Sequence, residues 1–334
     1  MNALAFVILA VMFGMYVLFD GYDLGAGIVY LFVGRDRSER GAVLESLGPY
    51  WNGNEVWLIA AGAALFAFFP LVYASSFSGF YLPLIIVLWL LMFRGIALEL
   101  RDFFANDLWQ QFFDVTFSVA SALLVLLFGV AFGNVLRGVP LGGTHYFAGT
   151  FAFLLNPFAV GVGLLAVLAL GLHGAARIAG HVAGEPAQRA ARAVRALWPA
   201  VTLLTIVITA ATFAVHSPVA NLAAMPWTAI APLAMLAGLI AIIVSANRGD
   251  APRMFGASNL YLAGMFASAA ATLFPYLLPG FPDASTGLRI DSVPPTPQSF
   301  LTILVIAIAG LVVVGAYRTF VVRQISADNQ VLKS

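Results

Sequence analysis

The chain has 334 residues, of which 62% are hydrophobic and 9% charged, with a net charge of +1, no cysteine and a mean hydropathy of +0.96. Soluble proteins carry roughly 25% charged residues, so this composition excludes a water-soluble globule and a large soluble domain. The small net charge excludes a nucleic-acid binder. The absence of cysteine excludes a disulfide-stapled fold, an iron–sulfur cluster and Cys-ligated zinc. We therefore expect a single integral membrane domain over residues 1–334.

Nine apolar runs come close to or exceed the length of about 20 residues that a helix needs to cross a bilayer. Runs such as residues 120–132 are apolar on every side, unlike the alternating strands of a membrane β-barrel. We predict an all-α integral membrane protein with nine transmembrane helices. The first run has no basic n-region and no cleavage site, so it is expected to be a retained helix. The predicted spans are residues 3–33, 56–72, 77–98, 113–135, 150–172, 197–215, 227–246, 255–278 and 300–320.

The basic residues divide unequally between the two ends of these spans. Fourteen of the sixteen Lys and Arg residues follow odd-numbered spans, whereas Arg137 and Arg289 lie on the other side. Because Lys and Arg are enriched on the cytoplasmic side, we predict an outside N-terminus and a cytoplasmic C-terminus. The connection 177–195 is expected to form a short basic amphipathic helix. Residues 279–299 form the longest outer connection, either a partner-facing flap or an ordinary irregular loop.

Two acidic residues, Asp20 and Asp23, interrupt the first span. Acids inside apolar runs are costly and point to function. Their spacing of three puts them on one helix face, roughly opposite a stripe formed by Gly14, Gly21 and Gly25. The stripe is expected to pack closely against one neighbouring helix. The alternative is that both acids are hydrated at the inner interface and paired with Arg35 or Arg37.

The second span begins with a further polar group. Asn52 and Glu55 have the spacing of a capping box, in which Glu55 would bond backbone N–H groups. The functional alternative is that Glu55 exchanges protons at the cytoplasmic mouth of a polar path that continues to Asp23.

Charged residues also cluster at the end of the third span. We expect Arg94, Glu99, Arg101 and Asp102 to form a structural ion-pair cluster, with Arg94 seeking a carboxyl on another helix because Glu99 lies too far round its own. The four histidines, His145, His173, His181 and His216, fall at span ends or in connections. An axial haem ligand normally lies well inside a helix, so no haem or metal is expected in this chain.

Five short motifs are spread over the first half of the chain: DGYDLG (20–25), WNGNEVWL (51–58), FSGFY (77–81), GVAFGN (129–134) and LNPF (155–158). In this order they resemble subunit II of the cytochrome bd family of respiratory quinol oxidases. The second half is similar in its number of spans and in residues 273–275, with weaker detail.

The resemblance implies two four-helix bundles plus one peripheral helix, in the inner membrane of a bacterium. It implies a partner, subunit I, that carries two b-type haems, haem d and the quinol-oxidising loop. Subunit II supports assembly without a haem of its own, and in some members it holds a structural quinone or contributes to a proton path from the cytoplasm. The other expected partners are quinol, lipid and a small single-span accessory subunit.

On this template Asp20, Asp23, Asn52 and Glu55 are the positions to associate with proton uptake. Several family members have Asp where this chain has Asn52, and Gln where it has Glu55. Asn cannot titrate, so a proton role at this point must pass to Glu55 or be absent.

Two other interpretations use the same residues. A proton-coupled secondary transporter would also need intramembrane carboxyls, with Pro83, Pro157, Pro232 and Pro275 marking broken helices. Transporters usually show paired interrupted segments in both halves, whereas the acids here gather towards the first half. A purely structural subunit would differ only in that Asp20, Asp23 and Glu55 would not titrate during turnover.

Overall fold

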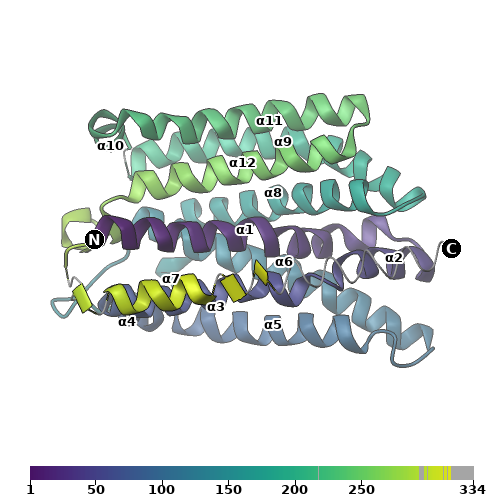
Figure 1. The fold of residues 1–334 in the computed structure, drawn as a ribbon, viewed down its shortest axis with the longest axis horizontal. Coiled ribbons are helices and arrows are strands. Elements are labelled where there is room, and N and C mark those ends of the chain that lie inside the picture. The colour runs from purple at the N-terminus through teal and green to yellow at the C-terminus, as the bar shows by residue number, and fades with distance from the viewer. Residues whose placement is uncertain (217, 293–296, 299, 311, 314, 317–334) are drawn as a thin grey trace.

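The computed structural model describes residues 1–216, 218–292, 297–298, 300–310, 312–313 and 315–316. It consists mainly of long helices lying side by side (Figure 1). Six helices in these ranges are long and apolar enough to cross a membrane, as expected for an all-α membrane protein. They are α1 (Asn2–Val33), α5 (Tyr81–Leu100), α6 (Asp107–Arg137), α8 (Pro157–His181), α9 (Glu185–Val215) and the continuous pair η1 (Pro226–Ala229) and α11 (Ile230–Arg248).

Three more helices lie where the remaining spans are predicted. These are α3 (Trp51–Phe68), α12 (Ala251–Leu273) and a short apolar helix, Phe300–Gly310. The predicted ninth span, 300–320, includes residues 311, 314 and 317–320, which lie outside the described residues. The count of nine transmembrane helices and the orientation of the chain therefore stay predictions.

Several predicted boundaries are wrong where proline begins a helix. α3 ends at Phe68, before position 72, because Pro70 lacks an N–H and its ring blocks the preceding turn. Pro70 instead begins α4 (Pro70–Gly79), so that α5 starts at Tyr81 and not at 77. The predicted span 150–172 is likewise divided into α7 (Phe151–Leu154) and α8, whose first N–H groups are capped by the side chain of Asn156.

The predicted amphipathic helix over 177–195 is also wrong. α8 continues to His181 and α9 begins at Glu185, so only residues 182–184 connect them. The charge of Arg177 indicated a span end near position 172, but the fold buries this residue to 8% exposure. Gly184 turns the chain with a φ of +77°, a conformation that favours glycine.

The long helices form two groups that meet along α1. In one group α1, α3, α5 and α6 pack together, and in the other α8, α9, α11 and α12 pack together. Both α1 and α6 contact α8. Figure 1 shows α1 between α12 and α3, so that side chains on different faces of α1 reach both groups.

The contact between α1 and α8 requires glycine. A Cβ atom on Gly25 would lie 1.9 Å from the carbonyl oxygen of Leu170, and one on Gly174 would lie 2.0 Å from the backbone nitrogen of Ala26. Such close approach is how small residues let membrane helices associate. Of the predicted stripe, Gly21 and Gly25 face α8, whereas Gly14 faces Phe266 of α12. The stripe therefore divides between two neighbours.

Short elements close the two ends of the molecule. At one end α2 (Arg37–Leu47) joins α1 to α3, and Arg189 of α9 pairs with Glu39 and donates to the carbonyl of Val33 over 2.7 Å. The hydrogen bond from Arg189 holds the pKa of Glu39 below its ordinary value. The other end contains α10 (Val219–Ala224), η2 (Ala284–Thr286) and a small antiparallel sheet of β1 (Tyr276–Leu278) and β2 (Leu288–Arg289). β1 lies just before the predicted outer loop, 279–299, and η2 and β2 lie in its first part. Residues 293–296 and 299 of this loop lie outside the described residues.

The glycine contact gives a first prediction. Gly174→Ala should lower the stability of the folded chain by about 3 kcal/mol or more, because overpacking against backbone moves a whole helix. The measurement is the thermal unfolding and yield of the detergent-purified protein. Gly180→Ala is the matched control on α8, since its Cβ would meet only ordinary contacts at 3.7 Å. Equal unfolding temperatures for the two variants would contradict the requirement for glycine.

Candidate functional site

Both acids of α1 are buried between helices. Asp20 and Asp23 are 0% exposed, and their partners come from α3 and α5 instead of from Arg35 or Arg37. An acid inside an apolar helix costs about 2.5–3.5 kcal/mol on insertion scales, so its partners matter for stability. These contacts define a candidate site at the centre of the first helix group.

Arg94 of α5 joins the two carboxyls that lie nearest to it. Its Nη2 atom is 3.2 Å from Oδ1 of Asp20, and its Nη1 atom is 3.8 Å from Oε1 of Glu55 on α3. Arg94 is 1% exposed, whereas the Glu55 side chain is 24% exposed. Glu55 therefore connects a fully buried ion pair with the surface of the subunit.

Asp23 is held by an amide instead of a cation. The Nδ2 atom of Asn54 donates to Oδ2 of Asp23 over 2.7 Å and to the hydroxyl of Tyr22 over 2.6 Å. Asn54 is 5% exposed and belongs to the first turn of α3. Among the described residues no cation lies within ion-pair distance of Asp23.

The site has more acceptors and more negative groups than its direct partners satisfy. Within the described residues Oδ2 of Asp20 and Oδ1 of Asp23 have no hydrogen-bond partner. Two of the three carboxyls, Asp20 and Glu55, also share the one guanidinium of Arg94. An unpaired buried carboxylate is strongly disfavoured, so this arrangement calls for water or a proton as the additional partner.

The capping box predicted at the start of the second span is wrong. α3 begins at Trp51, earlier than expected, and no side chain caps its first N–H groups. Asn52 is exposed in the first helical turn, while Asn54 two residues later faces Asp23. The capping box does not form because α3 already begins at Trp51, so that Asn52 lies inside the first helical turn and not before it.

The other predicted ion-pair residues lie in a separate cluster around Asp114. Arg101 donates through Nε to Asp114 over 2.5 Å and pairs with the exposed Asp102 over 2.9 Å. Asp114 also accepts from Tyr30 over 2.6 Å and from Arg40 over 3.0 Å. Glu99 is exposed on α5. Asp114 is thus fully neutralised, which suits a structural role joining α1, α2 and α6.

One histidine does lie well inside a helix, contrary to the expectation for all four. His173 is fully buried in α8, because that helix extends beyond its predicted end. Its Nδ1 atom is 2.8 Å from the hydroxyl of Ser258, and its Nε2 atom is 3.2 Å from the carbonyl of Leu18. Both ring nitrogens therefore have protein partners.

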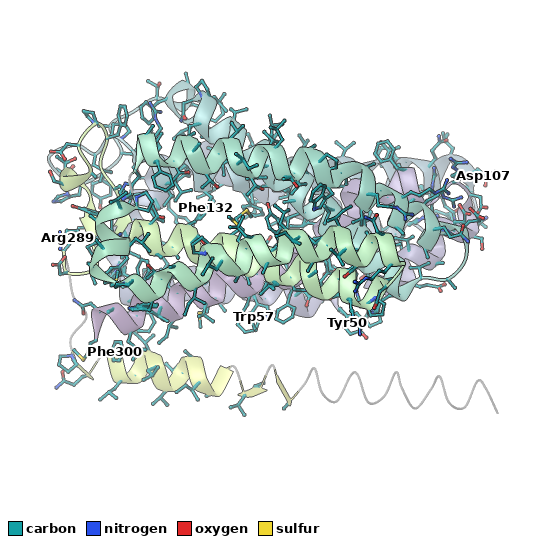
Figure 2. All side chains as sticks on the ribbon, turned by 90° about the horizontal axis from the view of Figure 1, so that it is seen from above. Tyr50, Trp57, Asp107, Phe132, Arg289 and Phe300 are labelled. Carbon is teal, nitrogen blue, oxygen red and sulfur yellow. The ribbon has the colours of Figure 1, made fainter. Side chains whose placement is uncertain are left out.

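Several site residues were missed by the sequence interpretation. Tyr22, Asn54, His173 and Arg177 lie in or beside the cluster, and Tyr16 lies beside Asp20. Tyr22 and Asn54 stood inside quoted motifs, and their polar groups next to an apolar run were the available signal. Figure 2 places Tyr50, which contacts Arg177, between Trp57 and the Asp107 end of the molecule.

The fold and this site together define a class: a polytopic helical membrane protein that buries carboxyls and arginines between its helices. The family profile described as "Cytochrome bd terminal oxidase subunit II" matches residues 1–325, and the chain belongs to this family. Membership makes it part of a respiratory-chain oxidoreductase complex of the bacterial inner membrane. The transporter interpretation is thereby set aside.

Individual proteins agree with this assignment. The chain is 32% identical to the "Probable cytochrome oxidase subunit 2" of Haemophilus influenzae over 334 residues, covering 89% of this chain and 87% of that protein. It is 40% identical over 174 residues to the "Cytochrome bd-I ubiquinol oxidase subunit 2" of Escherichia coli, covering 51% and 46% of the two chains. A chain of the bd oxidase from Geobacillus thermodenitrificans has the same fold, with a TM-score of 0.79, 18% identity and coverage of 97% and 98%.

The buried ion pair gives a second prediction. Arg94→Gln should destabilise the subunit by about 3–5 kcal/mol, because it leaves Asp20 buried without its cation. Adding Asp20→Asn should restore part of the loss. The measurement is the thermal unfolding temperature of the purified complex, with the exposed Glu99→Gln on the same helix as control. An Arg94→Gln protein that unfolds like the unaltered one would show that the pair contributes nothing.

Proposed function

We propose that this chain is the haem-free subunit of a quinol:oxygen oxidoreductase and supplies protons from the cytoplasmic side for the reduction of oxygen to water. The observation that carries the proposal is the buried cluster in which Arg94 pairs with Asp20 and Glu55 and Asn54 donates to Asp23. In this proposal two b-type haems and haem d belong to the partner, subunit I, which also oxidises quinol. The complex builds membrane potential because protons are drawn from inside while quinol releases its own outside.

The arrangement of the helices supports nine spans, and the bias of basic residues supports the outside N-terminus. The two groups of four long helices correspond to two four-helix bundles, and the helix Phe300–Gly310 corresponds to the beginning of the peripheral ninth. Asp107, predicted to be inside, and Arg289, predicted to be outside, lie at opposite ends of the molecule (Figure 2). An extra or missing span between them would put them at the same end.

The histidine contacts support a subunit without haem. His173 is the histidine that lies deep within a helix, and both of its ring nitrogens already have protein partners. Within the described residues no group of three or more His, Asp or Glu side chains could hold a metal ion. In this proposal the redox chemistry belongs to subunit I, and this chain contributes protein packing and proton exchange.

The proposed proton route begins at Glu55, which is partly exposed, and continues to the buried acids of α1. Arg94 contacts both Glu55 and Asp20, so a proton arriving at Glu55 weakens its pairing and leaves the cation to Asp20. One carboxyl oxygen of Asp23 has no partner among the described residues and can bind a proton or a water molecule. Asn52 has no titratable group, so Glu55 takes the entrance role.

A cavity of about 600 Å³ supports the structural quinone as a second element of this proposal. Its walls are apolar and come from α1, α6, α8 and α12 among other helices, and Tyr16, beside Asp20, is one of the lining residues. Phe132 and Phe266, also in the lining, stack with ring centroids 5.5 Å apart. This space suits the isoprenoid tail of a quinone or the acyl chain of a lipid.

The route through Asp23 gives a third prediction. Asp23→Asn removes the titratable group but keeps its size, so oxygen consumption with quinol should fall by about a hundredfold while assembly and haem content persist. Asp107→Asn, an exposed acid at the start of α6, is the control and should leave turnover unchanged.

Unchanged oxygen consumption by an intact Asp23→Asn complex would remove Asp23 from the route. It would also favour the purely structural subunit, in which none of the three acids titrates.

Asn52→Ala adds a separate check, because an exposed amide outside the route should be dispensable for turnover.

A further inference from the structure

Arg177 lies where the two helix groups meet, enclosed by aromatic rings. The carbon at the centre of its guanidinium is 5.0 Å from the ring centroid of Tyr22 and 5.6 Å from those of Tyr50 and Phe255. These rings belong to α1, to the residue before α3, and to α12. A cation over aromatic faces is attracted to them, most strongly where water is excluded.

The backbone contact between α1 and α8 determines where Arg177 points. Gly174 touches the backbone of Gly25 and Ala26, and Arg177 follows it by three residues, on the same face of α8. The close backbone contact between α8 and α1 therefore directs the Arg177 side chain towards Tyr22. His173, also on this side, stacks on Phe255 with ring centroids 5.1 Å apart.

A continuous chain of contacts leads from Arg177 to the buried acid. The guanidinium packs on the ring of Tyr22, the Tyr22 hydroxyl accepts from Nδ2 of Asn54, and the same nitrogen donates to Asp23. Asn54 therefore uses both of its N–H groups in this chain. A movement of the Tyr22 ring would change the donor available to Asp23.

We propose that Arg177 is a positioning residue for proton exchange at Asp23: it fixes the ring of Tyr22, and through it Asn54. This inference rests on the proposed function. A proton from cytoplasmic water converts the Asp23 carboxylate to the acid, and its release to the next acceptor restores the carboxylate. No electron passes through these residues. The titratable groups near Arg177 are Tyr22, Asp23, Tyr50, His173 and His181.

The test uses the complete oxidase complex, with rates expressed per haem. Arg177→Gln should lower kcat about tenfold, because small misplacements of reacting groups are costly, and should leave the KM for quinol unchanged. The ratio of kcat in H₂O to that in D₂O should rise, because proton delivery becomes rate-limiting. Arg177→Lys retains the charge and should recover most of the rate. Arg192→Gln, at a side chain that is 62% exposed, should change neither quantity.

An Arg177→Gln complex with the ordinary kcat and isotope ratio would overturn the inference, as would an Arg177→Lys complex no faster than Arg177→Gln. If Arg177→Gln does not assemble, Tyr22→Phe decides, because it keeps the ring and removes the acceptor of Asn54. Its isotope ratio should rise, and an unchanged ratio would overturn the inference. Normal turnover in Asp23→Asn would refute the proposed function itself, whereas slow Asp23→Asn with normal Arg177→Gln would refute only the role of Arg177.

Discussion

The pairing of Arg94 with two carboxyls from different helices is the interaction on which the rest of the site depends. It links α5 to α1 and α3 through side chains, and Arg94, at 1% exposure, has almost no water to replace a lost partner. A buried pair is weak evidence for stability by itself, but breaking one is costly. Arg94 thereby holds Asp20 and Glu55 in a fixed arrangement while leaving the group as a whole rich in negative charge.

The comparison with Asp114 shows why the two acidic clusters differ in chemistry. Asp114 accepts from two arginines and a tyrosine hydroxyl, which satisfies its charge and both of its oxygens. Asp23 has a single amide donor and an oxygen without a protein partner in the described part of the chain. The first arrangement stabilises a junction between helices, whereas the second leaves room for a proton to come and go.

The buried acids of α1 and the family of the chain were predictable from the sequence. Asp20 and Asp23 stood out because each interrupts an apolar run, and the motifs around them indicated the family. Their partners did not stand out, because Asn54 and Arg94 lie 31 and 74 residues away and the register between helices leaves no mark in a single sequence. The end of α8 was misplaced for a related reason: a charge usually marks the membrane boundary, but Arg177 is buried among aromatic rings. The apolar runs bounded by charged residues still predicted the positions of most of the long helices.

The central claim is that a carboxyl of this subunit binds and releases a proton during turnover. Infrared difference spectroscopy of the reduced and oxidised complex measures this directly, through the C=O stretching band of a protonated carboxylic acid. We expect a carboxylic acid band that changes between the two states and is absent from the Asp23→Asn complex. A difference spectrum without such a band, or with the same band in the Asp23→Asn complex, would contradict it.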